Sequence, residues 1–284
     1  MSDIPTASSN DEQADYWNTT AGLVWAQHQQ QLDRQLTPLG AEAMRVLAPA
    51  RGERILDIGC GCGESALQLA ARVGAAGAIV GADISEPMLE VARRRPLPAG
   101  AVQPDFRRRD AQIDDLGREV FDAAFSRFGV MFFSDPVTAF GNIRAALKPG
   151  GRLAFVCWRP LRDNPWMFAP MAAAAPLLPP APPMDPNAPG PFAFADDGRV
   201  RAILEDAGFA AVKIAPFDAH IGGGGLEDTV NLTLRVGPLG RALREQSQLA
   251  DAVVAAVREA IRPFETPRGV LMPAAVWIVS ARND

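Results

Sequence analysis

The sequence predicts an α/β protein with a doubly wound, mostly parallel sheet, and three observations lead to this prediction. Apolar stretches typical of strands alternate with helical stretches between Arg54 and Cys157, which is the pattern of parallel β-α-β units. A glycine-rich turn over residues 59–63 follows the first predicted strand and opens a helix. The chain has 284 residues, of which 48% are hydrophobic, and it can therefore bury a full core as one domain.

The glycine turn is the most informative stretch of the sequence. Residues 55–65 read Ile-Leu-Asp-Ile-Gly-Cys-Gly-Cys-Gly-Glu-Ser, and a helix is expected over residues 65–73. Glycine lets the backbone turn tightly and approach a ligand, and the start of the helix offers unpaired N–H groups. The sixth position from Gly59 is Glu64, so the dinucleotide-binding pattern is not fulfilled, and no P-loop lysine follows. The turn therefore predicts a nucleotide-like ligand without a pyrophosphate, and Asp57 suits a cationic end of that ligand.

Acidic residues stand at the ends of three predicted strands. Asp57 ends the first strand, Asp83 ends the strand over residues 77–84, and Asp110 follows the strand over residues 102–109. The carboxyl ends of parallel strands share one edge of the sheet, and ligands of open α/β sheets bind there. The carboxylate of Asp83 can accept hydrogen bonds from both hydroxyls of a ribose, and that of Asp110 can accept one from an exocyclic adenine amine.

Five short motifs follow one another between Arg54 and Trp158. They are Leu56-Asp-Ile-Gly-Cys-Gly-Cys-Gly63, Gly81-Ala-Asp-Ile-Ser85, Arg109-Asp-Ala111, Phe121-Asp-Ala-Ala-Phe-Ser126 and Ala146-Leu-Lys-Pro-Gly-Gly-Arg-Leu153. In order and spacing they resemble the motifs of class I S-adenosylmethionine-dependent methyltransferases, in particular small-molecule enzymes of the ubiquinone and menaquinone type. The resemblance implies a Rossmann-like, seven-stranded sheet with a reversed last strand. It also implies S-adenosylmethionine as cofactor and S-adenosylhomocysteine as product.

The resemblance assigns individual residues to the cofactor site. The residues that it implies are Asp57, Gly59, Gly61, Asp83, Ile84, Met88, Asp110, Ala111 and Ser126. Asp57 is expected to shape the glycine loop and to reach the methionine amino group through backbone or water. Met88 is expected to lie against the adenine ring, with a place in the core as the alternative. For Asp83 the alternative is an ordinary turn acid at the end of a strand.

Segments outside the α/β core are expected to cover it. We expect residues 1–50 to form an N-terminal helical cap, of which residues 1–15 are polar and mobile. We expect residues 51–284 to form the methyltransferase domain. A first insertion, about residues 158–195, is too rich in proline for a regular strand or a long helix. Its aromatic and methionine side chains favour an ordered lid over a flexible linker. A second insertion, about residues 221–265, opens with four glycines that predict a hinge or a loose turn.

Local signals place the remaining elements. Pro136 opens a helix predicted for residues 136–147, because proline is favoured in the first turn. Gly208 closes another helix, predicted for residues 196–207. The other predicted elements are helices near residues 228–236 and 249–261 and strands over residues 211–217 and 274–281.

Residues that follow the fourth and fifth strands are expected to form the acceptor pocket together with the cap. The predicted pocket residues are Trp25, Arg127, Phe128, Met131 and Trp158. They are mostly apolar, which indicates a small, partly apolar organic acceptor. Arg127 is expected to pair either with a carboxylate of cofactor or substrate or with a structural partner. His28 and His220 are weak candidates for a general base, which is needed only if the acceptor carries a proton that must leave.

Composition narrows the function further. The net charge of −5 gives no general attraction to nucleic acid, and no apolar stretch approaches the about 20 residues of a membrane span. The first ten residues lack a signal-peptide core, and three cysteines fit a reduced, cytoplasmic compartment. Cys60 and Cys62 lack partners at metal-ligand spacing, so no metal is predicted.

The function that these observations predict is transfer of a methyl group from S-adenosylmethionine to a small, partly apolar organic acceptor, as in secondary metabolism. If the protein associates, a homodimer is expected. One alternative is a methyltransferase of the lipid or sterol type. The other is a non-catalytic protein that binds S-adenosylmethionine.

Overall fold

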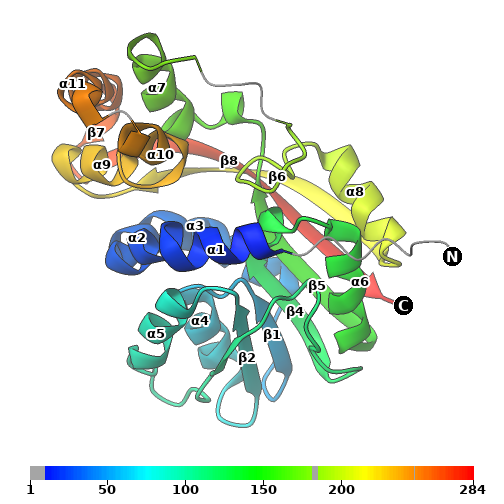
Figure 1. Cartoon of the computed structure of the whole chain (residues 1–284). Coiled ribbons are helices and arrows are strands. Elements are labelled where there is room, and N and C mark those ends of the chain that lie inside the picture. The colour runs from blue at the N-terminus through cyan, green and yellow to red at the C-terminus, as the bar shows by residue number, and fades with distance from the viewer. Residues whose placement is uncertain (1–9, 181–184, 246) are drawn as a thin grey trace, which may run out of the picture.

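A mixed sheet forms the centre of the structure and runs in the order β3-β2-β1-β4-β5-β8-β6 (Figure 1). The structure is a computed structural model that describes residues 10–180, 185–245 and 247–284. Neighbouring strands from β3 to β5 are parallel, and β8 runs antiparallel between β5 and β6. The strands are β1 (Arg54–Ile58), β2 (Ala78–Asp83), β3 (Asp105–Arg108), β4 (Phe121–Arg127), β5 (Leu147–Trp158), β6 (Ala210–Gly222), β7 (Glu265–Thr266) and β8 (Gly269–Asn283). The predicted α/β fold, a doubly wound and mostly parallel sheet with a reversed last strand, is confirmed, and β7 adds a short pair with β8.

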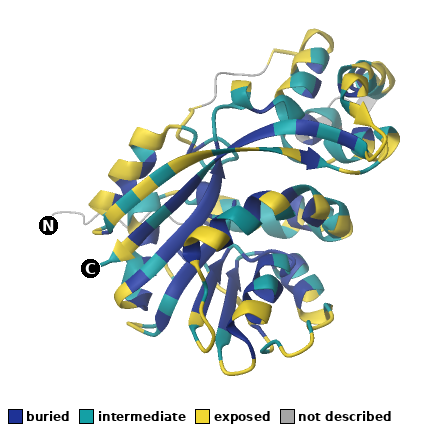
Figure 2. Cartoon of the chain, turned by 180° about the vertical axis from the view of Figure 1, so that it is seen from behind, coloured by how far each residue is buried: buried dark blue, intermediate teal, exposed yellow. Residues whose placement is uncertain are grey.

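Helices cover both faces of the sheet (Figure 1). One face carries α3 (Gln29–Leu47), α4 (Glu64–Val73) and α5 (Glu86–Arg94), and the other carries α6 (Pro136–Ala146) and α8 (Asp197–Asp206). The helices α4, α6 and α8 lie within one residue of their predicted bounds. The central strands β1, β2 and β4 are mostly buried, as the dark blue in Figure 2 shows, whereas β3 and β6 at the two edges are more exposed. Large aromatic side chains fill the core, and the largest fully buried ones are Phe121, Phe125, Phe140, Phe155 and Phe194.

The N-terminal cap consists of α1 (Asp11–Thr19), α2 (Ala21–Gln27) and α3. The expectation that residues 1–15 are mobile is wrong for residues 11–15, because α1 begins at Asp11, while residues 1–9 lie outside the described part. Polar side chains fix this helix to the loops below it. The amide of Asn18 donates to the carbonyl oxygen of Ile84 (2.9 Å) and accepts from the backbone N–H of Glu86 (3.0 Å). Polar residues therefore dock the cap rather than leave it free.

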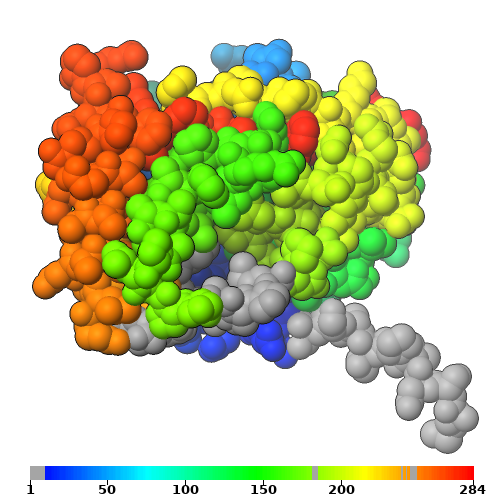
Figure 3. Space-filling view, turned by 90° about the horizontal axis from the view of Figure 1, so that it is seen from above, coloured from blue at the N-terminus to red at the C-terminus, as the bar shows by residue number. Residues whose placement is uncertain are grey.

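The two insertions fold together into a second, smaller apolar core. Its helices are α7 (Pro165–Ala174), α9 (Leu226–Thr233), α10 (Gly237–Glu245) and α11 (Ala250–Ile261). Their buried side chains, together with those at the start of β8, are Ala174, Val230, Leu239, Val253, Val257, Ile261, Val270 and Met272. We call this unit the lid. The space-filling view from above shows the chain around α7 lying beside the helices of the second insertion (Figure 3).

Proline did not prevent a helix in the first insertion. The ten-residue helix α7 forms there, so the prediction against a long regular helix was too strict. Pro165 occupies the first turn, where the missing N–H would have had no intrahelical partner. Pro170 lies inside the helix and is tolerated as a buried contact. The helix α10 of the second insertion was not predicted from the sequence.

The four glycines at residues 222–225 connect the end of β6 to α9, and a hinge at this point stays a prediction. The strand β6 continues to Gly222. The φ angle of Gly222 is 128°, a value that residues other than glycine rarely adopt, and a Cβ there would clash with the carbonyl oxygen of Val270. Gly223 donates to that same oxygen (2.8 Å), and Val270 donates to the carbonyl oxygen of Gly224 (2.8 Å). Glycine therefore lets two strands come close together where the lid leaves the sheet.

Asn164 anchors the lid to the main sheet. Its side chain is fully buried, and its Nδ2 donates to the carbonyl oxygens of Arg159 (3.0 Å) and Pro160 (3.2 Å). Its Oδ1 accepts from Nε1 of Trp166 (3.1 Å) and from the backbone N–H of Ala275 in β8 (2.9 Å). One amide thus satisfies four polar groups at the start of α7.

Replacing Asn164 with alanine is expected to lower the free energy of unfolding by about 2–4 kcal/mol, because buried donors and acceptors lose their partners. Urea denaturation measures this difference. Asn187→Ala, at an exposed position, is the matched control and should leave stability within about 0.5 kcal/mol of the wild type. Equal stability of the two variants would contradict the anchoring role.

Candidate functional site

The glycine loop connects β1 to α4 at the carboxyl edge of the sheet. Gly59, Gly61 and Gly63 have φ angles of 63°, 53° and 84°, which L-residues rarely adopt. A Cβ on Gly59 would lie 2.7 Å from Cα of Gly129, so the loop also packs on the backbone that follows β4. The prediction that this turn requires glycine is therefore confirmed, because of the backbone conformation at all three positions and because of the lack of space for a side chain at Gly59.

Asp57 lies fully buried beneath this loop. Its Oδ2 accepts a hydrogen bond from Oγ of Ser65 at 2.6 Å. Its Oδ1 is buried and has no hydrogen-bond partner among the described residues. Burial raises the pKa of Asp57 to about 7, against the lowering effects of Ser65 and of the charge on Arg127. An unpaired buried carboxylate oxygen is costly, and a cationic ligand group would relieve that cost.

Asp83 joins the glycine loop to the loop after β2. Its Oδ2 accepts from the backbone N–H of Gly61 (2.7 Å), and its Oδ1 accepts from that of Ser85 (2.8 Å). Burial raises the pKa of Asp83, and these backbone hydrogen bonds oppose the rise. Each carboxylate oxygen retains a second lone pair, so both can still accept from neighbouring hydroxyls.

Asp110 is the third acid at this edge and is half-buried. Its Oδ1 accepts from the backbone N–H of Gln112 (2.9 Å) and from the amide of Asn10 in the cap (3.4 Å). Burial raises the pKa of Asp110. The three predicted strand-end carboxylates therefore lie along one edge, with the cap helices directly above them (Figure 1).

A buried carboxylate of the cap, Asp33 in α3, completes the surroundings of the loop. Its Oδ1 pairs with Nη2 of Arg127 at the end of β4 (3.2 Å), and its Oδ2 pairs with Nη1 of Arg95 (2.6 Å). Arg95 in turn pairs with Glu64 at the start of α4. Of the two alternatives predicted for Arg127, the structure shows the structural ion pair. Asp33 was missed, and the only available signal was an acid next to the apolar face of a helix.

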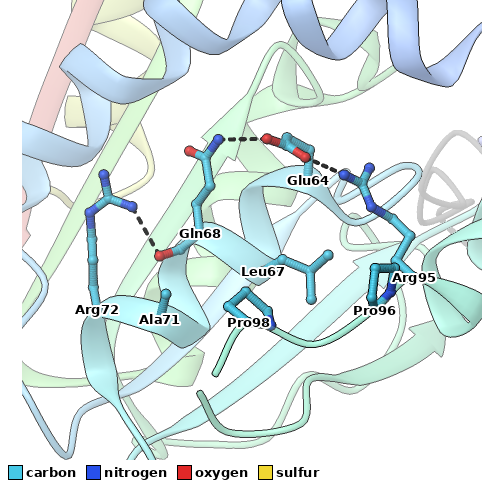
Figure 4. Close-up of a pocket in the computed structure, with 8 residues that line it drawn as sticks. All are labelled: Glu64, Leu67, Gln68, Ala71, Arg72, Arg95, Pro96 and Pro98. Atoms are coloured by element: carbon cyan, nitrogen blue, oxygen red, sulfur yellow. Dashed lines mark hydrogen bonds and ion pairs between the residues drawn. The ribbon is translucent and has the colours of Figure 1, made fainter. Parts of the chain in front are cut away.

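Figure 4 shows the outer side of this network, where Arg95 reaches Glu64. Glu64 also accepts from Nε2 of Gln68 at 2.7 Å. A cavity of about 340 Å³ lies between α4 and residues 96–98. None of the strand-end acids lines it, so this hollow is separate from the glycine-loop site.

The predicted pocket residues fall into two groups, one of which follows the ends of β4 and β5. Phe128 stacks on Trp158 with ring centroids 4.2 Å apart, and Trp158 contacts Trp166 of the lid at 4.8 Å. Phe128 has a φ of 65°, which is a strained value for this residue type. Phe128, Met131 and Trp158 are buried and form an apolar wall, and Trp166 is half-buried beside them. Trp25 belongs to a second aromatic group, formed with Trp17 and Phe132.

The other predicted cofactor residues take varied places around the loop. The hydroxyl of Ser126 donates to the carbonyl oxygen of Ile58 (2.8 Å) and accepts from the N–H of Gly129 (3.2 Å), so it ties β4 to β1. The methyl end of Met88 packs on Gly61, which suits a place in the core as well as one beside a ligand. Ala111 is buried next to Asp110, and Ile84 is half-buried beneath α1.

The histidines lie in two different places. His220 is exposed on β6 opposite Pro273, and no described contact joins it to the strand-end acids. His28 lies at the junction of α2 and α3, where its Nδ1 bonds to Oε1 of Gln31 at 3.0 Å. Of the two predicted candidates for a base, His28 is therefore half-buried and His220 is exposed.

The cysteines are inert loop and strand residues. Burial raises the pKa of the Cys62 thiol to about 12 and that of Cys60 well above its usual range. Among residues 10–180, 185–245 and 247–284, no group of three or more histidine, cysteine or acidic side chains is arranged to hold a metal ion. Within the same residues, no helix has the length and apolar character needed to cross a membrane.

The order of strands in the sheet and the glycine loop after β1 are those of a Rossmann-like methyltransferase fold. Residues 55–151 match the family model described as "Methyltransferase domain". Over these residues the chain is similar to that family, as the resemblance of its motifs predicted.

Curated relatives match part of the chain. An aklanonic acid methyltransferase of Streptomyces sp. (strain C5) is 34% identical over 42% of this chain and 54% of its own length. An O-methyltransferase of Penicillium expansum is 34% identical over 62% of this chain and 58% of its own. A demethylmenaquinone methyltransferase of Clavibacter sepedonicus is 42% identical over 38% of this chain and 42% of its own. The chain thus spans about half the length of the curated relatives it matches.

Solved structures with the same fold cover more of the chain at lower identity. The phosphoethanolamine N-methyltransferase 2 of Haemonchus contortus, in complex with S-adenosyl-L-methionine, has a TM-score of 0.58 at 16% identity and covers 97% of this chain and 60% of its own. The cyclase SpnF has a TM-score of 0.50 at 21% identity and covers 86% of this chain and 80% of its own. Because proteins of different activity share the fold, the activity must be argued from the site.

Proposed function

We propose that this protein transfers a methyl group from S-adenosylmethionine to a small, partly apolar organic acceptor. The observation that carries the proposal is the row of three strand-end carboxylates beside the glycine loop, one of which has an unpaired buried oxygen. The donor set fits the cofactor at each end. Asp57 suits its ammonium group, Asp83 suits its ribose hydroxyls and Asp110 suits its adenine amine. Met88 and Ala111 offer apolar surface for the adenine ring.

The cofactor, when bound, supplies a methyl group that is already electrophilic, so the protein mainly has to hold the acceptor in line with it. The apolar wall of Phe128, Met131 and Trp158 supports an acceptor with apolar character. The named activities of the relatives, on aklanonic acid and on a demethylated menaquinone, are of the same chemical kind.

The net charge of −5 supports a small-molecule acceptor over nucleic acid. A homodimer, a cytoplasmic location and independence from metals stay predictions from the sequence. The lipid or sterol type remains the alternative acceptor class, and a non-catalytic binder remains the alternative class of protein.

Titration calorimetry is expected to show that S-adenosylhomocysteine binds with a stoichiometry of about one, whereas NAD and ATP do not compete, because the loop lacks a pyrophosphate cradle. Transfer of a labelled methyl group to a panel of hydroxylated aromatic compounds, with and without chelator, then tests turnover. Cofactor binding without transfer to any acceptor of the panel would favour the non-catalytic alternative. Competition by NAD or ATP would contradict the cofactor assignment.

A further inference from the structure

A cluster of four charged side chains joins the cap to the glycine loop. Asp33 of α3 pairs with Arg127 at the end of β4 and with Arg95 after α5. Arg95 also pairs with Glu64 at the start of α4 (Figure 4). Its Nη1 donates in addition to the carbonyl oxygen of Cys62 in the glycine loop (3.3 Å). The two guanidinium groups and the two carboxylates therefore neutralise one another beside the loop.

Arg127 lies on the same face of the sheet as Asp57. The strands β1 and β4 are parallel, and Asp57 is paired in register with Phe125. Residues paired in register point to the same face, and so does every second residue along a strand. Arg127 comes two residues after Phe125, so its side chain leaves the sheet on the face from which Asp57 projects. Its positive charge lowers the pKa of Asp57, although burial has the larger, opposite effect.

The cap packs directly on Arg127. A Cβ on Gly40 of α3 would lie 2.9 Å from Cδ of Arg127, so the absence of a side chain lets the helix come this close. About two turns earlier in the same helix, Oδ1 of Asp33 accepts from Nη2 of Arg127 at 3.2 Å. One guanidinium thus forms an ion pair with the cap and acts electrostatically on Asp57.

Asp33 determines how much of the Arg127 charge acts on Asp57. While the ion pair is formed, the opposite charges of Asp33 and Arg127 largely cancel at a distance. Oδ1 of Asp57 then has no hydrogen-bond partner in the described part of the chain. Without Asp33, Arg127 would be a buried cation that has lost its carboxylate partner, which is costly. Asp57 would then attract that cation, in competition with the ammonium group of a ligand.

We propose that Asp33 is a positioning residue of the cofactor site: by pairing with Arg127 it holds that charge at the cap, so that Asp57 stays available to the ammonium end of S-adenosylmethionine. This inference rests on the proposed function. It makes the docking of the cap a condition for tight binding, because a cap that moves away takes Asp33 with it and leaves Arg127 to Asp57. Asp33 thus acts on the ligand through Arg127 and Asp57.

The other groups around Asp57 act in defined directions. Oγ of Ser65 in α4 donates to its Oδ2 and lowers its pKa, whereas the charge of Asp83 on β2 raises it. Burial raises the pKa of the Cys60 thiol in the glycine loop well above its usual range, so this thiol stays neutral. Substitutions in the ion pair leave these three side chains in place, and their effects can therefore be compared directly with the wild type.

Carbon NMR of the aspartate carboxyl groups tests the charge effect in the ligand-free protein. Protein labelled with ¹³C at these carbons is titrated through neutral pH, and Asp57→Asn identifies the resonance of Asp57. In the wild type its midpoint is expected at a pH of about 7. Asp33→Asn should lower the midpoint by about one pH unit, and Arg127→Gln should raise it by about as much. The double variant should titrate close to the wild type.

A merely structural role of the ion pair would give a different result. Loss of either partner would then loosen the cap in the same way, and the two midpoints would not move in opposite directions. Glu227→Gln is the matched control, because it also removes a carboxylate from an arginine, Arg258 in the lid (2.7 Å). This control should leave the midpoint of Asp57 unchanged.

Titration calorimetry connects the charge effect to the ligand. At a pH above the midpoint, Asp33→Asn should bind S-adenosylhomocysteine about tenfold or more weakly than the wild type, because Arg127 competes with the ammonium group. 5′-Methylthioadenosine lacks that group, and its affinity should stay within about twofold. A cap that has only become loose would weaken the binding of both ligands alike.

The outcomes distinguish this inference from the proposed function. If S-adenosylhomocysteine does not bind the wild type, the proposed function fails, and this inference fails with it. If it binds but the two single variants leave the midpoint of Asp57 unchanged or shift it in the same direction, only the role given to Asp33 is wrong. Equal weakening of both ligands in Asp33→Asn would also overturn that role. Should Asp33→Asn not fold, Arg127→Gln decides alone: a raised midpoint supports the inference, and an unchanged one overturns it.

Discussion

Replacing Asp83 with alanine is expected to weaken the binding of S-adenosylhomocysteine by about 100-fold or more. The two ribose hydroxyls would lose their hydrogen bonds to the carboxylate, each of which contributes about 1.5–3 kcal/mol. A difference of about 1.4 kcal/mol corresponds to a tenfold change in affinity. The variant also frees the backbone N–H groups of Gly61 and Ser85, which loosens the loop around the ligand. Titration calorimetry measures the change.

A second ligand shows whether Asp83 acts by contacting the ribose or by supporting the glycine loop. The 2′-deoxy analogue of S-adenosylhomocysteine should bind the wild type more weakly than the parent compound, and this difference should disappear in Asp83→Ala. Asp105→Ala, at an exposed site on β3, is the control and should bind both ligands as the wild type does. A difference that persists in Asp83→Ala would show that another group holds the ribose.

The affinity for S-adenosylhomocysteine is expected to rise with pH through neutrality because of Asp57. In the ligand-free protein this carboxyl has a pKa of about 7, and only its ionised form pairs well with an ammonium group. Below pH 7 binding must first remove the proton, which costs up to about tenfold in affinity per pH unit. 5′-Methylthioadenosine lacks the ammonium group and should show no such dependence. Equal pH profiles for the two ligands, or an unchanged profile in Asp57→Asn, would contradict the assignment.

The stability of the ligand-free protein should fall as the pH rises through neutrality, whereas its affinity for S-adenosylhomocysteine should rise. The folded pKa of Asp57, about 7, lies above its ordinary value of 3.8, so the folded state binds the proton more tightly than the unfolded state. The stabilising contribution is complete below pH 3.8 and is lost as the pH rises through 7. The full difference is roughly 4 kcal/mol at 1.36 kcal/mol per pKa unit. Above pH 7, Asp57→Asn should therefore unfold at higher urea concentration than the wild type.

Local sequence patterns were sufficient for the sheet and for the position of three acidic residues at its carboxyl edge. Alternating apolar segments and the glycine turn determine which strands are parallel, and the end of each strand determines where its acid lies. Asp57, Asp83 and Asp110 could therefore be located before any contact was known. Their hydrogen bonds could not, because the partners, such as Asn10 for Asp110, come from distant parts of the chain.

The lid and the cap were harder to predict because long-range contacts decide them. The helix α7 forms in spite of its prolines because Asn164 and the second core hold it in place. Asp33 looks like a surface acid of an amphipathic helix, and only the ends of β4 and α5 supply the arginines that bury it. The sequence contains each of these residues but not the distances between them.

The separation of the two apolar cores has a consequence for how specificity can change. Among the residues that the structure describes, no buried residue belongs to both cores, and Trp166 is a partly buried side chain that packs against each of them. Under the proposed function, substitutions inside the lid would therefore reshape the surface that faces the acceptor, while the packing around the glycine loop stays unchanged. A protein built in this way would acquire new acceptors by small steps, each of which leaves the methyl donor in its place.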